Sequence, residues 1–332
     1  MYTSDLLFDC VELARKVRAA VLPHMGTFGA RDQVGTAVGG DATMKIDEVA
    51  EGVVRAFIEE RPTYSIYTED AGLNKSPRAE AILVVDPIDG TRPAAAGFES
   101  SCVSVAATAN LEDPVLDDIE AACVLEIKSG TCFLADSNGE VAIVAGEERL
   151  RPSPTDNSDL SSAFWAGGYR GRPYLPVAAA VSSLADACAI GGSTFDLGSA
   201  SYIMTRIVTG QLDAYVDPAL RVLATYPVLE AEFLRAGRGA VVCNAPYDIA
   251  AAYLCLRNAG GVVTDAWGEA IGTRSLLGSD RQAQISIVAA SNAKLHKAIL
   301  AELDASISAM EELVPCIVSF STALQKGALE VN

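Results

Sequence analysis

The amino-acid sequence predicts an α/β protein in two halves, an α+β N-terminal half followed by an α/β C-terminal half. Three observations support this prediction. An apolar run at residues 81–85, rich in β-branched side chains, has the length of a buried strand and ends in an acidic turn. Apolar stretches between residues 101 and 144 are separated by short turn sequences, as in antiparallel sheets. After a polar, proline-rich segment at residues 151–158, helical and strand patterns follow one another.

In the N-terminal half, apolar residues recur every three to four positions over residues 3–21 and 48–60, which predicts two helices. Pro62 ends the second one, because the residue before a proline avoids the helical conformation. A glycine-rich connector at residues 23–40 lies between them. Strands are expected at residues 64–67, 81–85, 101–109, 120–127, 130–135 and 141–144.

In the C-terminal half, the same periodicities predict a second set of elements. Pro227 is expected to break a helical segment, and Gly260 and Gly261 end a strongly apolar helix. The loop 191–194 is expected to cap the helix that follows it. Strands are expected at residues 162–168, 212–216, 262–265 and 285–290, and helices at 175–189, 195–208, 220–236, 247–259 and 292–303.

These patterns divide the chain into three parts. Residues 1–150 form an α+β domain, residues 151–304 form an α/β domain, and residues 305–332 form an amphipathic or loosely docked tail. At 332 residues the chain is long enough for two domains with a large core.

The charge and cysteine content exclude several classes of function. A net charge of −18 argues against nucleic acid or an anionic membrane as a partner. The eight cysteines include no C-x-x-C pair, so neither a zinc site nor a redox pair is indicated. The first residues have no basic-then-apolar leader, and no apolar run approaches 18 residues. A soluble, cytoplasmic protein is therefore expected.

The chain is organised around the stretch Val84-Val-Asp-Pro-Ile-Asp-Gly-Thr91. Here the predicted strand ends in two carboxylates, Asp86 and Asp89, where α/β folds usually bind their ligands. Thr91 is expected to cap a helix, and a helix N-terminus attracts phosphate while paired carboxylates attract hard cations. The alternative interpretation is a strand followed by an aspartate-rich turn.

Further acidic residues lie at predicted turns or element ends. Asp248 begins an apolar helix, where capping is the alternative explanation. Clustered like charges repel, so such a cluster persists mainly when a cation occupies it. Because the ligands would be oxygens and histidine is nearly absent, Mg²⁺ is favoured over Zn²⁺. The carboxylates in question are Asp41, Asp47, Glu69, Asp70, Asp86, Asp89 and Asp248.

Four segments, in this order, resemble the inositol monophosphatase / fructose-1,6-bisphosphatase superfamily of Mg²⁺-dependent, lithium-sensitive phosphatases. The central stretch resembles the signature of that superfamily. The other three segments are Gly40-Asp-x-Thr-x-Lys-x-Asp47, Thr68-Glu-Asp-Ala-Gly72 and Tyr247-Asp-Ile-Ala-Ala with Ala259-Gly-Gly-Val-Val-Thr-Asp265. The resemblance implies a layered α/β/α/β/α sandwich with metals between its two halves.

The resemblance also implies a site. Glu69, Asp86 and the Ile88 carbonyl would bind one metal, and Asp86, Asp89 and Asp248 a second. Asp41, Glu69 and Thr91 would be catalytic, with Asp41 and Thr91 orienting the attacking water; Asp47 would cap or buttress. The backbone N–H groups of Gly90 and Thr91 would hold the phosphate. Two or three Mg²⁺ ions are expected.

The chain departs from this family around the predicted site. Arg92-Pro-Ala-Ala-Ala-Gly97 replaces an aromatic-rich segment, so Arg92 could reach a substrate anion. An insertion is inferred at about residues 217–239, where the family places substrate-selecting groups. Arg170 and Arg172 could hold a hydroxyl or a second phosphate, or lie at the surface. Ser193 and Thr194 could meet substrate, or cap a helix.

The expected function is Mg²⁺-dependent hydrolysis of a phosphomonoester on a small polyol or sugar, by a water that the metal activates. Within this class, a fructose-1,6-bisphosphatase or a 3′-phosphonucleotide phosphatase is the alternative. From another class, the alternative is a non-catalytic protein that binds or senses sugar phosphates. Retention of the four metal carboxylates and Thr91 favours the enzyme. The expected partners are a small phosphorylated substrate and a second copy of the chain, as a homodimer.

Overall fold

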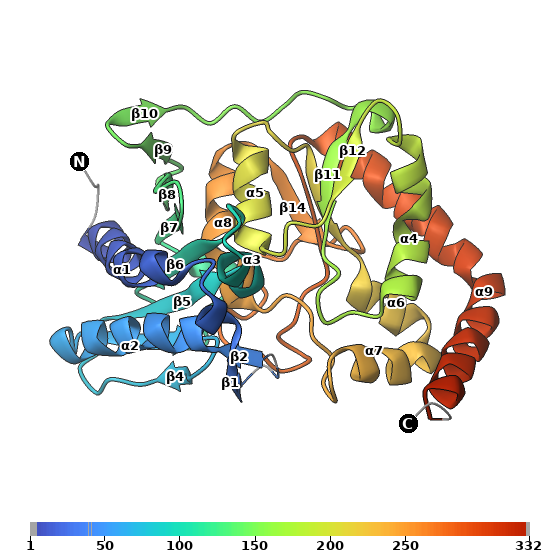
Figure 1. Ribbon diagram of the computed structural model, residues 1–332. Helices are drawn as coiled ribbons and strands as arrows, with labels where there is room; N and C mark the ends of the chain where they lie inside the picture. Colours follow the sequence, from blue (N-terminus) through green and yellow to red (C-terminus); the bar gives the residue numbers. More distant parts are fainter. Residues whose placement is uncertain (1–4, 39, 41, 330–332) are drawn as a thin grey trace.

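The computed structural model describes residues 5–38, 40 and 42–329, without the side chains of 325–329, and it confirms the predicted fold class. Five layers follow one another across the molecule, alternately helical and sheet (Figure 1). Helices α1 (Asp5–Val21) and α2 (Lys45–Glu60) form the first layer, α5 (Ala200–Val208) and α8 (Pro246–Asn258) the third, and α4 (Tyr174–Ala187), α6 (Ala219–Thr225) and α9 (Ala293–Leu329) the fifth.

The second layer is an eight-stranded sheet with the order β10-β9-β8-β7-β6-β5-β3-β4. All neighbouring strands are antiparallel except β3 and β5, which run parallel. The strands are β3 (Tyr64–Thr68), β4 (Gly72–Asn74), β5 (Ala81–Asp89), β6 (Cys102–Thr108), β7 (Ala121–Glu126), β8 (Cys132–Asp136), β9 (Val141–Ala145) and β10 (Glu148–Leu150).

The fourth layer is a five-stranded sheet with the order β12-β11-β13-β15-β14, in which β11 is parallel to both of its neighbours. Its strands are β11 (Phe164–Gly167), β12 (Ser193–Phe195), β13 (Ala214–Asp217), β14 (Val262–Asp265) and β15 (Ile287–Ala290). A separate hairpin joins β1 (Gln33–Thr36) and β2 (Ala42–Met44). Short 3₁₀ turns are η1 (Leu22–His24), η2 (Phe28–Arg31), η3 (Leu116–Asp118), η4 (Leu160–Ser162) and η5 (Pro227–Leu229).

The layers explain why the strands are apolar along their whole length. Every residue of β5, β6, β7 and β8 is buried, because helices cover both faces of the sheet. Helix α8 lies between the two sheets, and ten of its thirteen residues are buried. The strongly apolar pattern that predicted this helix therefore reflects its central position. This helix carries a carboxylate from the C-terminal half to the N-terminal sheet.

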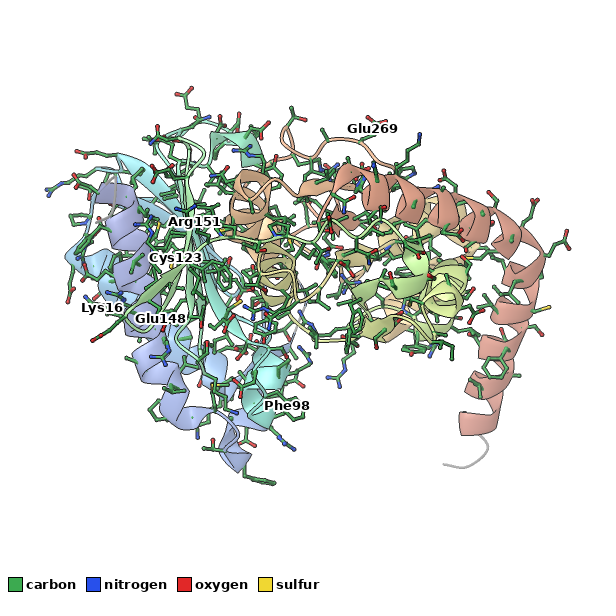
Figure 2. All side chains as sticks on the ribbon, turned by 90° about the horizontal axis from the view of Figure 1, so that it is seen from above. Lys16, Phe98, Cys123, Glu148, Arg151 and Glu269 are labelled. Carbon is green, nitrogen blue, oxygen red and sulfur yellow. The ribbon has the colours of Figure 1, made fainter. Side chains whose placement is uncertain are left out.

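The C-terminal region differs from the predicted tail. Helix α9 continues from Ala293 to Leu329, so the predicted boundary at 304/305 falls inside one helix. Met310, Val314 and Ile317 are buried in the outer apolar core with residues of α6 and α7 (Glu230–Ala236). The last part of α9 projects beyond the other elements in Figure 2. Pro227 breaks the segment 217–239 as predicted, giving α6, η5 and α7.

Helix α9 also bears on the predicted absence of a membrane partner. Among the described residues it is the one helix that could span a membrane by length and composition, over residues 293–324, where an 18-residue window has a mean hydropathy of 1.3 and is 28% buried. Leu295, Ile299 and Leu303 of this helix are buried against the five-stranded sheet side of the molecule. The absence of a membrane partner stays a prediction.

Two predicted boundaries are wrong, and both affect the site. The helix expected at 195–208 begins only at Ala200, after strand β12 and a loop, because Ser199 rather than residues 191–194 supplies its cap. Strand β5 does not end at Val85 but continues through Asp89, since pairing with β6 resumes beyond an irregularity. The predicted division at 150/151 falls between β10 and β11, which belong to different sheets.

Candidate active site

Two acidic segments lie at the same edge of the eight-stranded sheet. Strands β3 and β5 are parallel and paired up to Thr68 and Val85, so Glu69 and Asp86 follow at the same level. Side chains at the carboxyl ends of parallel strands meet at one edge, where ligands bind in such sheets. The fold thereby brings together acids that are seventeen or more residues apart in sequence.

A bulge turns Asp86 and Asp89 toward one another. Residues three apart in a regular strand point to opposite faces of the sheet. Asp86 pairs with Ser104 and Asp89 pairs with Cys102, so two residues of β5 face a single residue of β6 between these pairs. The extra residue restores the same face for both carboxylates. Pro87 and Ile88 therefore form the bulge that places both carboxylates on one face of the sheet.

Asp248 joins this pair from the other half of the chain. It is the third residue of α8, and its carboxylate accepts a hydrogen bond from the Ala245 N–H at 2.6 Å. The Ser201 hydroxyl donates to its carbonyl at 2.7 Å. Asp248 thus caps the helix and also faces the cluster, so the two interpretations of this residue hold together.

Three carboxylates form a compact cluster. One oxygen from each of Asp86, Asp89 and Asp248 lies within 4.8 Å of the others, a spacing that could hold a metal ion. Burial raises the pKa of Asp89 to about 7, helped by the charge of Asp248, against hydrogen bonds from Ser199 and Ser201. Burial, followed by the charges of Glu69 and Asp89, raises the pKa of Asp86 well above its ordinary value. Without a cation, the cluster favours bound protons.

Glu69 and Asp47 lie beside this cluster. Burial and then the charges of Asp248 and Asp47 raise the pKa of Glu69 well above its usual range. Burial also raises the pKa of Asp47 to about 7, although hydrogen bonds from the Met44 N–H and the Thr91 hydroxyl oppose it. Asp47 caps α2, as expected, and in addition reaches Thr91. Asp41 lies outside the described residues.

The residues present fit hard divalent cations. The donors that meet at the sheet edge are carboxylate oxygens, together with the Ile88 carbonyl, to which the Thr91 hydroxyl donates at 3.1 Å. Asp86 is 1% exposed and Asp89 is 6% exposed, so their repulsion is poorly screened by water. Oxygen donors of this kind match Mg²⁺ and Ca²⁺ rather than Zn²⁺.

The turn after β5 also has a special backbone. Gly90, not Thr91, is the N-cap of the short helix α3 (Thr91–Ala96), and its φ of 92° lies in the left-handed region. A Cβ added to Gly90 would lie 2.6 Å from the Ser100 carbonyl oxygen. Both the conformation and the space therefore require glycine here. Arg92 is half-buried; burial lowers its pKa, while Glu69 and Asp47 oppose this.

Arg170 and Arg172 occupy different environments. Arg170 is partly buried near Asp248, and burial lowers its pKa, against the charge of Asp248. Arg172 is buried and forms a two-pronged ion pair with Asp217, with Nε 3.3 Å from Oδ1. Asn244 also donates to Asp217, at 2.8 Å. Arg172 is thus held within the protein by β13, whereas Arg170 faces the cluster.

Ser193 and Thr194 are not brought to the cluster. They lie in the edge strand β12, where the Thr194 hydroxyl is 3.7 Å from the Cys188 sulfur. Ser199 is the serine that reaches the site, donating to Asp89 at 2.8 Å and capping α5. Sequence reasoning missed Ser199 as a site residue, and it expected Asp47 to cap or buttress without predicting its contact with Thr91. A second Gly-Ser pair, Gly198-Ser199, directly before an amphipathic segment was the available signal for Ser199.

Three cavities meet at this site and share Arg170 as a lining residue. The innermost is about 40 Å³, and its lining includes Asp89, Asp248, Arg172 and Asn244. An apolar groove of about 750 Å³ is lined by Phe98, Phe195, Leu197 and Tyr202. Phe98 lies at the surface beyond α3 in Figure 2. A basic chamber of about 410 Å³ lies on another side of Arg92 and Arg170.

Comparison with known proteins agrees with this geometry. The chain is 29% identical over 319 residues to the fructose-1,6-bisphosphatase/inositol-1-monophosphatase of Methanothermobacter thermautotrophicus, covering 92% of this chain and 99% of that protein. It is 24% identical to the bifunctional NADP phosphatase/NAD kinase of Methanococcus maripaludis, covering 89% of this chain and about half (49%) of that protein. The structure of Thermotoga maritima IMPase matches with a TM-score of 0.65 and 19% identity, over 92% of this chain and 100% of that one.

The model of the inositol monophosphatase family matches residues 4–308. This family and the two named relatives are phosphatases, so the comparisons support an enzyme that hydrolyses phosphate esters. Members of the family depend on metal ions, in agreement with the carboxylate cluster. The chain belongs to the inositol monophosphatase family.

Proposed function

We propose that this protein is a Mg²⁺-dependent phosphatase that hydrolyses a phosphomonoester of a small polyol or sugar. The observation that carries the proposal is the cluster of Asp86, Asp89 and Asp248, which come from different parts of the chain. Each of these carboxylates has its pKa raised, which a divalent cation would reverse. Without a bound cation, the repulsion among these buried carboxylates would only lower the stability of the fold.

The proposed metal ligands are those expected from the sequence. Glu69, Asp86, the Ile88 carbonyl, Asp89 and Asp248 would hold two or three Mg²⁺ ions. When bound, such ions neutralise phosphoryl charge and lower the pKa of a water molecule. The protein contributes fixed positions: Ser199 and Ser201 orient Asp89, and the Ala245 N–H orients Asp248. These hydrogen bonds keep the ligand set in place before a substrate arrives.

Other groups would act on the substrate and the attacking water. The backbone N–H groups of Gly90 and Thr91 would hold phosphoryl oxygens, in the turn that requires glycine. The Thr91 hydroxyl, which also bonds Asp47, would orient the water together with Glu69. Asp47, through its hydrogen bond with Thr91, would help to orient the water. The same role expected of Asp41 stays a prediction. Arg92 would meet the charge of the phosphate.

The substrate class rests on the family and on the names of the relatives. One relative is named for fructose 1,6-bisphosphate and inositol 1-phosphate, and another for NADP. A sugar bisphosphatase and a 3′-phosphonucleotide phosphatase are therefore the candidates beside a polyol monophosphatase. A non-catalytic sugar-phosphate binder is the candidate from another class.

A phosphate-release assay tests the proposal. Inositol 1-phosphate, fructose 1,6-bisphosphate, glycerol 2-phosphate and adenosine 3′,5′-bisphosphate would be incubated with the protein and Mg²⁺. We expect release that EDTA abolishes and that Asp89→Asn removes. An absence of release from every ester with Mg²⁺ present would overturn the enzyme and favour the binder.

We also propose a cytoplasmic homodimer. Light scattering after size exclusion would give twice the chain mass of 34.6 kDa if the dimer forms. Cell fractionation would place the protein in the soluble fraction. A monomer, or recovery with membranes, would contradict the respective proposal.

A further inference from the structure

The innermost cavity is too small for the alcohol part of a phosphomonoester. Its volume of about 40 Å³ is far below the roughly 300–1,000 Å³ of typical ligand pockets. Arg172 and Asn244 line it, and both are held in place by hydrogen bonds to the buried Asp217. The rest of the substrate must therefore extend past Arg92 and Arg170, into one of the two larger cavities.

One of these cavities, the basic chamber, gathers positive charge. Its volume of about 410 Å³ lies within the roughly 300–1,000 Å³ of typical ligand pockets. Four arginines line it, Arg31, Arg92, Arg170 and Arg238, and none of its other described lining residues carries a carboxylate. The described lining of the chamber is therefore positively charged, although the net charge of the whole chain is −18. Arg92 and Arg170 already lie near carboxylates of the acidic cluster, so an anion in the chamber would mainly offset the charges of Arg31 and Arg238.

The walls of the chamber are built by segments that touch each other. The Arg238 guanidinium donates to the Gln33 side-chain oxygen at 3.1 Å, which links the segment 217–239 to the β1–β2 hairpin. A Cβ added to Gly40 would lie 2.9 Å from the Ala240 Cβ, so the backbones are also in close approach there. Arg238 itself has a φ of 54°, an uncommon conformation for a residue with a side chain. These contacts hold Arg238 in the wall of the chamber, which Arg31 also lines.

We propose that the basic chamber binds a second anionic group of the substrate, a phosphoryl or carboxylate group, through Arg31 and Arg238. This inference rests on the proposed phosphatase activity, because the scissile phosphate would occupy the carboxylate cluster at the same time. Arg170 lines both the chamber and the cavity beside Asp89 and Asp248, so the two anion sites adjoin each other at this residue. The segment 217–239 then has a function, which is to supply a selecting arginine.

Two matched pairs of esters test this proposal. Fructose 1-phosphate differs from fructose 1,6-bisphosphate, and adenosine 3′-phosphate from adenosine 3′,5′-bisphosphate, only in the second phosphoryl group. With Mg²⁺ and the full chain, we expect kcat/KM for the bisphosphate of at least one pair to exceed that of its partner about tenfold or more. Arg238→Ala and Arg31→Ala should each lower that value about ten- to a hundredfold, mainly through KM, as for a lost hydrogen bond to a charged group.

Arg235→Ala is the matched control. Arg235 lies in the same inserted segment, pairs with Glu232 in α7 and does not line the chamber. This variant should keep the preference for the bisphosphate, and all three variants should keep their activity on the monophosphate. Equal losses on both members of a pair, or a wild type without any preference for bisphosphates, would overturn the proposal.

The two proposals can fail separately. If no ester releases phosphate, the proposed activity is wrong, and calorimetric titration with fructose 1,6-bisphosphate then tests the chamber. A weaker Kd for Arg238→Ala than for the wild type would still support it. The same Kd for both proteins, or no binding to either, would refute it.

Discussion

Replacing Asp89 by asparagine should make the metal-free protein more stable while abolishing its activity. The asparagine side chain has nearly the same volume, and its oxygen can accept the hydrogen bonds from Ser199 and the Ser201 N–H. What the variant lacks is the charge. Removal of charge acts in opposite directions on the empty cluster, where carboxylates repel, and on the loaded cluster, where they bind cations.

The size of the stability effect follows from the pKa of Asp89. Its rise from 3.8 to about 7 in the folded chain corresponds to about 4 kcal/mol in the free energy of unfolding. Because the folded value is the higher one, this stability is present below pH 3.8 and is lost as the pH rises through 7. At pH 8 in EDTA, Asp89→Asn should therefore gain between about 1 and 4 kcal/mol, the lower figure applying if Asp86 and Asp248 share protons with Asp89.

Urea denaturation at pH 8, with EDTA and with Mg²⁺, measures this effect. Mg²⁺ at a hundred times its Kd should stabilise the wild type by about 2.7 kcal/mol and the variant much less. The rate of phosphate release should fall by several orders of magnitude. Asp186→Asn, at an exposed position near the end of α4, is the control and should change none of these quantities. A variant that is less stable in EDTA, or that Mg²⁺ stabilises as much as the wild type, would refute the reasoning.

Three other predictions follow from the same structure. Mg²⁺ should raise the Tm of the wild type more at pH 8 than at pH 5, because protons compete for the carboxylates below the Asp89 pKa of about 7. An equal Tm shift at both pH values in differential scanning fluorimetry would contradict the proposal that Mg²⁺ binds this cluster. Arg172→Met should lower the free energy of unfolding, measured in urea, by about 3–5 kcal/mol, because it leaves Asp217 buried without its ion pair. Adding Asp217→Asn should recover part of this loss, and no recovery would mean that lost packing is the cause. Gly90→Ala should lower both Tm and activity, because the new Cβ would lie 2.6 Å from the Ser100 carbonyl oxygen. Gly139→Ala, at φ 86° with open space around it, should lower the free energy of unfolding by only about 1 kcal/mol. Similar losses of stability at both positions would show that backbone conformation alone matters.

The sequence was most informative where local chemistry and burial agree. The apolar run of β5, the broken helix at Pro227 and the strongly apolar α8 were all predicted, because the local residue pattern of each agrees with its burial in the fold. The prediction was wrong between residues 191 and 199. Either of two Gly-Ser pairs could cap a helix, and only packing against Asp89 distinguishes Ser199 from Ser193.

The prediction was also incomplete at the C-terminus. Residues 305–329 continue α9 through Pro315, where a proline normally weakens a helix. The buried residues Met310, Val314 and Ile317 belong to the outer apolar core, in which α9 packs against α4, and this packing is a long-range effect. A local pattern does not contain it.

By itself, the sequence determined the candidates for the chemistry: acidic turns after apolar strands, a glycine before a helix, and an aspartate at the head of α8. Only the tertiary structure decided which way those side chains point. Asp86 and Asp89 share a face because β5 carries one residue more than β6, and Arg172 turns inward because Asp217 is buried beside it. These side-chain orientations depend on strand pairing and burial between segments far apart in the chain. The free energy of such contacts cannot be read from the sequence of one segment alone.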